Sequence, residues 1–374
     1  MKKRIVLLIL LMVLAVSLLS SYSYANETEG FTEKAVVLEA DEITSSEITD
    51  GLESYEQYVK LKITSGKYKG ETFEVLNNLS NNPVYDIPVK SGDKVVVYME
   101  ETEAGDVNVF ISDYMRDRYI IYLYLLFVVL IILIGRTKGL KAVISLTVTM
   151  FTIIKIMLPL FLKGMNPIAL TVGASIFVTI FTLLVIAGIN SKSAAAIIGT
   201  TSGVMIAGLL AYFVGSSVRL TGMSNEEAVM LLYIPQGITF DFKGLLFSGI
   251  IMGALGAVMD IGMSIASAVE EIYKANPCLT RRELFTSGMN VGRDVMGTMT
   301  NTLILAYTGS SIPLLLLFMA YETSMVKILN LDIIATEAVR SLTGSIGLVL
   351  TIPITAAVAS TLIKRKKQCM TDEN

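Results

Sequence analysis

Hydrophobic and polar residues alternate along residues 26–118. In the stretch YVKLKIT, Val59, Leu61 and Ile63 share one side of an extended chain, and the lysines between them share the other. The stretches AVVLEADEI, TFEVL, KVVVYM and VNVFI repeat this period, with glycine-containing turns between the runs. The pattern predicts about five strands, and a small closed barrel of the OB or SH3 type would leave few strand edges open.

From Tyr119 onward, long uncharged runs replace the alternation. Each run is close to the ~20 residues that a helix needs to cross the hydrocarbon core of a bilayer. The runs predict seven transmembrane segments, at about 119–135, 140–162, 166–188, 193–214, 243–266, 294–319 and 338–363. Residues 119–364 are therefore expected to form an α-helical polytopic membrane domain that follows the all-β domain.

The first 25 residues have the layout of a secretory signal peptide. A basic start, an apolar stretch and the small-x-small group Ser23-Tyr24-Ala25 follow one another, which predicts cleavage after Ala25. The alternative is an uncleaved N-terminal anchor, because the apolar stretch is nearly long enough to span. Either interpretation exports residues 26–118.

The cationic residues predict the orientation in the membrane. They cluster after the odd-numbered segments, at Arg136, Lys138, Lys141, Lys192, Lys274, Arg281, Arg282, Arg293 and the closing KRKK. Because cytoplasmic loops are enriched in Lys and Arg, the β-domain is expected outside the membrane and the tail 365–374 in the cytoplasm. This describes a multi-pass protein of the plasma membrane.

The sixth segment contains helix-breaking residues between Gly309 and Pro313. They indicate one interrupted span or two short helices that meet at membrane depth. One broken span is favoured, because two full spans would place the basic tail outside. Such interruptions bind ions or substrates in transporters, and the alternative is a simple proline kink.

The composition limits the partners and the kinds of catalytic site that can be expected. The chain is 53% hydrophobic with a net charge of −3, so nucleic acid is not an expected partner. It has no histidine and two distant cysteines, which removes His-containing zinc sites, Ser-His-Asp triads and Cys-His nucleophiles. No phosphate-binding glycine loop or nucleophile elbow is present, so neither an enzyme nor a bound cofactor is expected.

The fifth segment contains a carboxylate, Asp260, within an apolar run. Helical spacing aligns it with small and polar residues on one stripe: Gly249, Gly253, Gly256, Ser264, Ser267 and Glu271. A carboxylate at the bilayer centre costs about 2.5–3.5 kcal/mol, so the stripe is expected to face protein or a cavity. Gly249-x-x-x-Gly253 suggests close approach of another helix. Asp260 then lines an ion or substrate path, or pairs with a neighbouring helix; Glu270 and Glu271 fit a solvated helix end.

The sixth segment supplies candidate partners for Asp260. Asp294, Thr298 and Asn301 share one helical face. Asp294 lies at the predicted cytoplasmic rim, where capping or topology is its simpler role. Asn301 fits helix–helix hydrogen bonding and ligand contact about equally.

Three segments carry a resemblance to a known family. GALGAVMDIGMSIASAVEEI, RRELFTSGMNVGRDVMGTMTNTLILAYTG and PLLLLFMAY, after an exported β-rich domain, resemble the YibE/F-like bacterial membrane proteins. The likeness covers most of the chain after the signal peptide, and its most specific part is the Asp260 segment. It implies the architecture and a bacterial plasma membrane, but no substrate.

Two functions follow as hypotheses. The first is a transporter or permease that uses Asp260, where Gly309 and Pro313 supply backbone ligands. The other candidate path residues are Asp294, Asn301, Thr298, Ser264 and Glu271. The second is a non-transporting scaffold or sensor whose β-domain binds an envelope ligand or partner. The expected partners are the bilayer, an unknown small molecule or ion, and a second membrane protein or a homo-oligomer.

Overall fold

The computed structural model describes residues 30–48, 52–80, 82, 84–102, 106–234, 238–322 and 324–363. The predicted signal peptide and cytoplasmic tail lie outside these ranges. The chain divides at Leu130 into two compact units, here called the β-unit and the helical unit.

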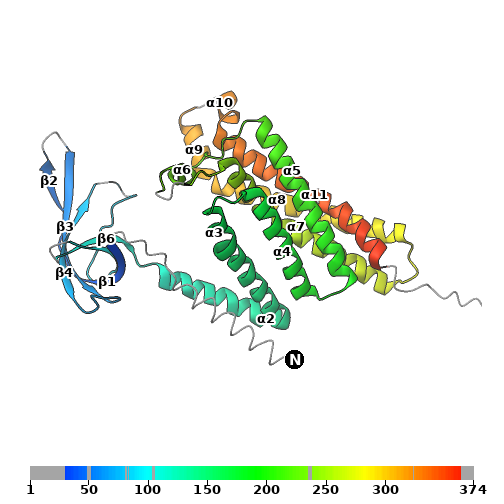
Figure 1. The fold of residues 1–374 in the computed structure, drawn as a ribbon, viewed down its shortest axis with the longest axis horizontal. Helices are drawn as coiled ribbons and strands as arrows, with labels where there is room; N and C mark the ends of the chain where they lie inside the picture. The colour runs from blue at the N-terminus through cyan, green and yellow to red at the C-terminus, as the bar shows by residue number, and fades with distance from the viewer. Residues whose placement is uncertain are drawn as a thin grey trace, which may run out of the picture. The chain divides into compact units, whose positions relative to one another are not determined.

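The β-unit is a six-stranded, wholly antiparallel sheet in the order β2-β3-β1-β5-β6, with β4 paired to β3 (Figure 1). Its strands are β1 (Gly30–Ala40), β2 (Thr44–Ile48), β3 (Leu52–Ile63), β4 (Thr72–Leu79), β5 (Lys94–Glu101) and β6 (Val107–Tyr114). The five predicted strands are confirmed. The added strand β2 pairs with the start of β3, and its sequence TSSEI lacks the alternation that marks the others.

The alternation of β3 sets which side chains form the core. Val59, Leu61 and Ile63 are each at most 2% exposed, whereas the lysines between them are accessible. The sheet curls far enough for β4 and β6 to contact each other. The hydrophobic side chains of β1, β3 and β5 thereby meet inside one curved layer. The assignment to an OB or SH3 barrel stays a prediction.

Two buried amides fasten the segment before β5 to the sheet. Gln57 donates to the carbonyls of Asp41 (3.1 Å) and Val89 (2.7 Å) and accepts from the Val89 amide (3.1 Å). Asn77 donates to the Ile87 carbonyl at 2.9 Å. Because these amides stand in for missing backbone partners, the β-unit satisfies its buried polar side chains internally.

Helices make up the rest of the described chain (Figure 1). They are α2 (Asp117–Phe151), the π-helix η1 (Thr152–Met157), α3 (Leu158–Phe161), α4 (Pro167–Ala187), α5 (Ser191–Ser217), α6 (Glu226–Met230), the 3₁₀-helix η2 (Leu231–Tyr233), α7 (Phe242–Ala275), α8 (Arg281–Ser310), α9 (Ile312–Ala320), α10 (Met325–Leu329) and α11 (Asp332–Ile363).

Five of these helical stretches are long and apolar enough to cross a membrane, and the bent pair α8–α9 would make a sixth. One of the five, Asp117–Phe161, is interrupted at Arg136, whose φ of 48° and ψ of −124° are not helical. The interruption falls where the sequence places a loop between the first two predicted spans. The count of seven spans stays a prediction.

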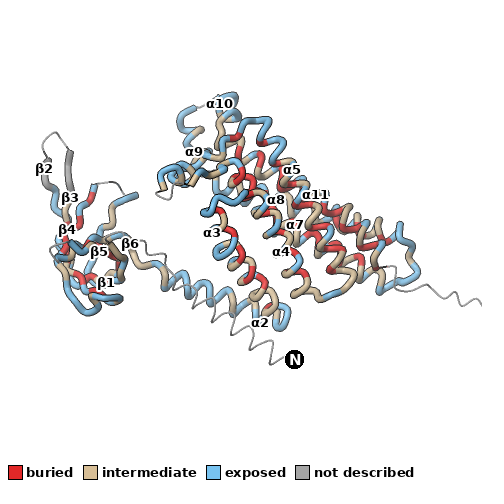
Figure 2. The backbone as a smooth tube through the Cα atoms, viewed as in Figure 1, coloured by how far each residue is buried: buried red, intermediate tan, exposed pale blue. Residues whose placement is uncertain are grey.

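The core of the helical unit lies among α5, α7, α8 and α11, where the buried residues concentrate (Figure 2). Glycines let these helices approach closely. A Cβ on Gly199 would lie 1.9 Å from the Thr355 hydroxyl, and one on Gly262 would lie 2.5 Å from the Thr200 hydroxyl. The threonine oxygens therefore point at glycine Cα groups of neighbouring helices, as in the weak Cα–H···O contacts of helix interfaces.

Candidate functional site

The predicted stripe lies on one face of α7, and that face is open. Asp260, Ser264 and Glu271 are exposed, as are the three stripe glycines. The opposite face carries Val258, Ile261 and Ile265, all fully buried. The greatest burial of α7 is thus on the side that meets α5 and α11.

The close helix approach expected at Gly249-x-x-x-Gly253 is not made within the described chain. A Cβ on Gly249 or Gly256 would meet nothing within 4 Å, and one on Gly253 would meet the Tyr307 hydroxyl. Helix α7 carries glycines on two faces, and the close approach of another helix at Gly249-x-x-x-Gly253 stays a prediction. The described helices pack against the face of Gly262.

Helix α8 has a matching open face. Asp294, Thr298 and Asn301 are all exposed, whereas Gly292 and Leu303 on the other side are buried against α11 and α7. The capping box at Thr280 and Glu283 begins this helix well before the predicted span. The polar face of α8 therefore continues into the N-terminal part of the helix, which precedes the apolar stretch.

The contact between α7 and α8 brings the two open faces to the same level. The two helices run antiparallel, and the Gly292 position lies against the Ile265 side chain. Both helices rise about 1.5 Å per residue. The residue five positions before Ile265 on α7 therefore lies level with the residue five positions after Gly292 on α8. These residues are Asp260 and Gly297. Asn301 is then about one turn away along the axis.

The polar groups on these faces make few contacts. Among the described residues, the side chains of Asp260, Asp294 and Asn301 form no hydrogen bond or ion pair with one another or with the rest. The Thr298 hydroxyl donates to the Val295 carbonyl on its own helix at 2.9 Å. Two carboxylates and an amide are thus left for something outside this set of residues.

The break after α8 is confirmed, and the chain bends there by 59°. The hydroxyls of Ser310 and Ser311 both donate to the Tyr307 carbonyl, at 2.7 and 3.2 Å. Pro313 lies in the first turn of α9, where its missing amide hydrogen costs little. The serines thus engage a carbonyl that the break would otherwise free, while Gly309 stays open to its surroundings.

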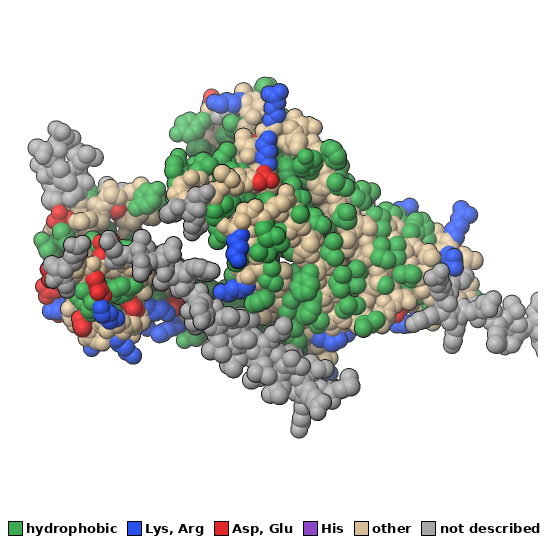
Figure 3. Space-filling model, viewed as in Figure 1, with side chains coloured by type: hydrophobic (Ala, Val, Ile, Leu, Met, Phe, Trp, Pro, Cys, Tyr) green, Lys and Arg blue, Asp and Glu red, His purple; other side chains and the backbone are tan. Residues whose placement is uncertain are grey.

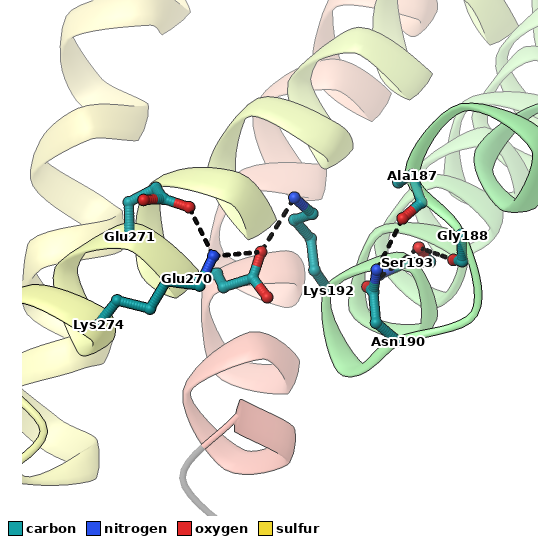
Figure 4. A network of polar contacts seen from close by, with 8 residues as sticks. All are labelled: Ala187, Gly188, Asn190, Lys192, Ser193, Glu270, Glu271 and Lys274. Carbon is teal, nitrogen blue, oxygen red and sulfur yellow. Dashed lines mark hydrogen bonds and ion pairs between the residues drawn. The ribbon is translucent and has the colours of Figure 1, made fainter. Parts of the chain in front are cut away.

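The C-terminal end of α7 takes part in an ion-pair network that was not predicted from the sequence (Figure 4). Glu271 pairs with Lys274 at 2.8 Å, as a solvated helix end would. Glu270 lies 3.7 Å from Lys274 and also bridges to Lys192 on α5 at 2.9 Å, and the Lys192 and Glu270 side chains are only about a fifth exposed. The sequence pattern indicated only a role in orientation for Lys192, which lies in the first turn of α5.

A second missed cluster joins α8 and α11. Glu337 and Arg340 pair at 2.7 Å, with about a quarter of each side chain exposed. The Arg340 guanidinium lies 5.9 Å from the centre of the Tyr307 ring. Arg340 falls inside the predicted span 338–363, so a charge within that span was the available signal. The pair is self-neutralising, which favours a structural role.

The other side of the helical unit differs in character. Hydrophobic side chains gather over α4 and α5 in Figure 3, where a cavity of about 140 Å³ is lined mainly by aliphatic residues. None of the predicted path residues lines it. Within the described residues, no group of three Asp, Glu, Cys or His side chains could hold a metal ion.

Comparison with known families connects both units. Residues 29–114 match the YibE/F family N-terminal domain, and residues 123–365 match the YibE/F-like protein family. Comparison with curated proteins gave no match, and neither did comparison with solved structures. The family models span the β-unit and the apolar helices together, so the chain belongs to the YibE/F-like family.

Proposed function

We propose that this YibE/F-like protein is a membrane permease and that its path runs along the open faces of α7 and α8. The observation that supports the proposal is the pair of carboxylates, Asp260 and Asp294, exposed without a partner among the described residues. Asp260 lies inside its predicted span and Asp294 at the predicted cytoplasmic rim, and intramembrane carboxylates without a structural partner commonly mark ion or proton pathways.

The charge of this face favours a cationic solute. The face carries two carboxylates, and the Arg293 guanidinium, which precedes Asp294 on α8, donates to the neutral Asn290 side chain at 3.1 Å. Thr298, Ser264 and Asn301 add oxygen ligands, which suit a hard cation or a proton carried by water. Under the predicted orientation, Asp260 would lie in the cytoplasmic half of its span.

The test is binding of defined cations to the purified full-length protein. Thermal unfolding is recorded with and without Na⁺, K⁺, Mg²⁺, Mn²⁺ and arginine, at two pH values, for wild type and Asp260→Asn. A cation that binds only the folded state stabilises it by about 2.7 kcal/mol at 100 times its Kd. We expect one cation to stabilise the wild type and to lose at least tenfold in affinity with Asp260→Asn.

Glu271→Gln is the matched control, since it removes a carboxylate from the same helix outside the apolar window. Flux of the binding cation into proteoliposomes, lost in Asp260→Asn and kept in Glu271→Gln, would establish transport. Binding that survives Asp260→Asn unchanged would contradict the path. It would favour the scaffold or sensor hypothesis, in which the β-unit holds the ligand.

A further inference from the structure

The proposed path has one wall. α7 and α8 form it, and in the described chain nothing covers the face that carries Asp260 and Asn301. We propose that a second copy of this chain covers this face, related to the first by a two-fold axis along the membrane normal. The inference rests on the proposed function, because it names what closes the same path.

Small residues give the second copy room to approach. Gly256 lies on the open face of α7 and Gly297 on that of α8, and a Cβ at either position would meet nothing within 4 Å. Gly297 is level with Asp260, by the register of the two helices. Glycines permit close helix contact between copies, and no described neighbour uses these two.

The charges and amides of the face complement a rotated copy of themselves. Arg293 lies four residues from Gly297, which is about 6 Å along the axis and within the reach of an arginine side chain. Among the described residues, the Arg293 side chain bonds only to the neutral Asn290 amide, and neither Asp260 nor Asp294 has a cationic partner. In a two-fold pair each guanidinium can face a carboxylate of the other copy. The Asn301 amide, with donors and an acceptor, can pair with its own equivalent.

Lipid is the competing cover, and the chemistry disfavours it. Acyl chains offer no hydrogen bonds to carboxylates or amides, which makes such exposure costly. The α4–α5 side, with its aliphatic surface, is the face suited to lipid (Figure 3). Two copies carry four of these carboxylates and two of these guanidiniums. The enclosed path therefore keeps negative charge, in agreement with a cation as solute.

Disulfide trapping tests the interface. Cys278 and Cys369 are replaced by serine, Gly297→Cys is introduced, and membranes are oxidised with copper phenanthroline. We expect a covalent species of twice the monomer mass. Leu209→Cys, on the exposed side of α5, is the control and should stay monomeric. Equal trapping at both positions, or none at residue 297, would overturn the proposal.

A second variant tests the interface without an added thiol. Gly256→Leu should leave the monomer at least as stable to heat, since the site is open. It should convert a dimer to a monomer in native mass spectrometry. A wild-type monomer in lipid nanodiscs would also overturn the proposal. If cation binding still depends on Asp260 in that monomer, the permease function stands alone. A dimer that binds no cation would leave the interface standing and remove the permease.

Discussion

The β-unit and the helical unit differ in whether their polar side chains have hydrogen-bond partners within the chain. In the β-unit, buried Gln57 and Asn77 have their amide groups matched to backbone carbonyls and amides of nearby loops. In the helical unit, one side of α7 is closely packed. Asp260 and Asp294 are exposed instead and have no partners among the described residues. Polar groups that are matched within the chain hold the fold together. Polar groups left open in an apolar region indicate where a ligand or another chain must come.

The largest expected effect is at the packed side of the helical unit. Gly199→Ala places a methyl carbon 1.9 Å from the Thr355 hydroxyl and 3.2 Å from the Thr355 Cα, so two helix backbones must separate. Overpacking of this kind costs about 1–3 kcal/mol, and more where backbone must move, so we expect at least about 3 kcal/mol. Thermal unfolding in detergent measures it.

Gly256→Ala is the matched control for that substitution. Its methyl group meets nothing within 4 Å, and alanine favours a helix interior by roughly 0.5–1 kcal/mol over glycine. The monomer should be as stable as wild type or slightly more. Equal destabilisation by the two substitutions would contradict the contrast between packed and open faces.

The second effect is at the matched amides of the β-unit. Gln57→Ala leaves the Val89 amide and carbonyl without partners at a site where Gln57 is 4% exposed. A buried polar group left unsatisfied costs about 1–3 kcal/mol. Hydrogen exchange of the backbone amides of residues 86, 87, 89 and 90 should rise sharply. Lys62→Ala, on the exposed side of the same strand, should leave this exchange unchanged.

The third prediction compares two carboxylates of α7. Glu270→Gln breaks a partly buried pair with Lys192, and we expect a loss of about 1 kcal/mol, discounted for solvent screening. Asp260→Asn removes no described contact, so stability should change by less than about 0.5 kcal/mol. Cation binding should show the reverse order. A large loss of stability with Asp260→Asn would mean that the carboxylate is structural after all.

The patterns along the sequence predicted most of the fold for a physical reason. Strand alternation and long apolar runs are local consequences of burial, so Val59, Leu61 and Ile63 are buried as expected and the predicted apolar runs lie in long helices, whereas the number of spans stays a prediction. Strand β2 was missed because it is polar and depends on pairing with β3. Its register becomes visible only once the hairpin is formed.

The site was harder to predict because spacing shows which residues share a face but not what the face meets. The stripe through Asp260 was correctly placed on one side of α7. The helix approach expected at Gly249 stays a prediction, whereas Gly262, on a second small-residue face, packs against Thr200 of α5. Lys192 and Glu270 lie far apart in the chain, and no local sequence pattern predicts a contact between them.

The smallest effect is a pH dependence confined to the β-unit. Lys67 donates to Glu101 at 2.6 Å and Tyr68 donates to it at 3.1 Å, and these bonds hold the pKa of the Glu101 carboxyl below its ordinary value of 4.5. A carboxyl whose folded-state pKa is lowered contributes stability at pH values above 4.5, and this contribution is lost as the pH falls through the folded-state pKa. The Glu101→Gln variant lacks this dependence. Amide exchange of β5, compared between the two proteins at matched pH, should be slower in wild type at pH 7 and should converge toward the variant near pH 3. A difference that persists unchanged at the acidic end would show that the Lys67–Glu101 pair does not produce it.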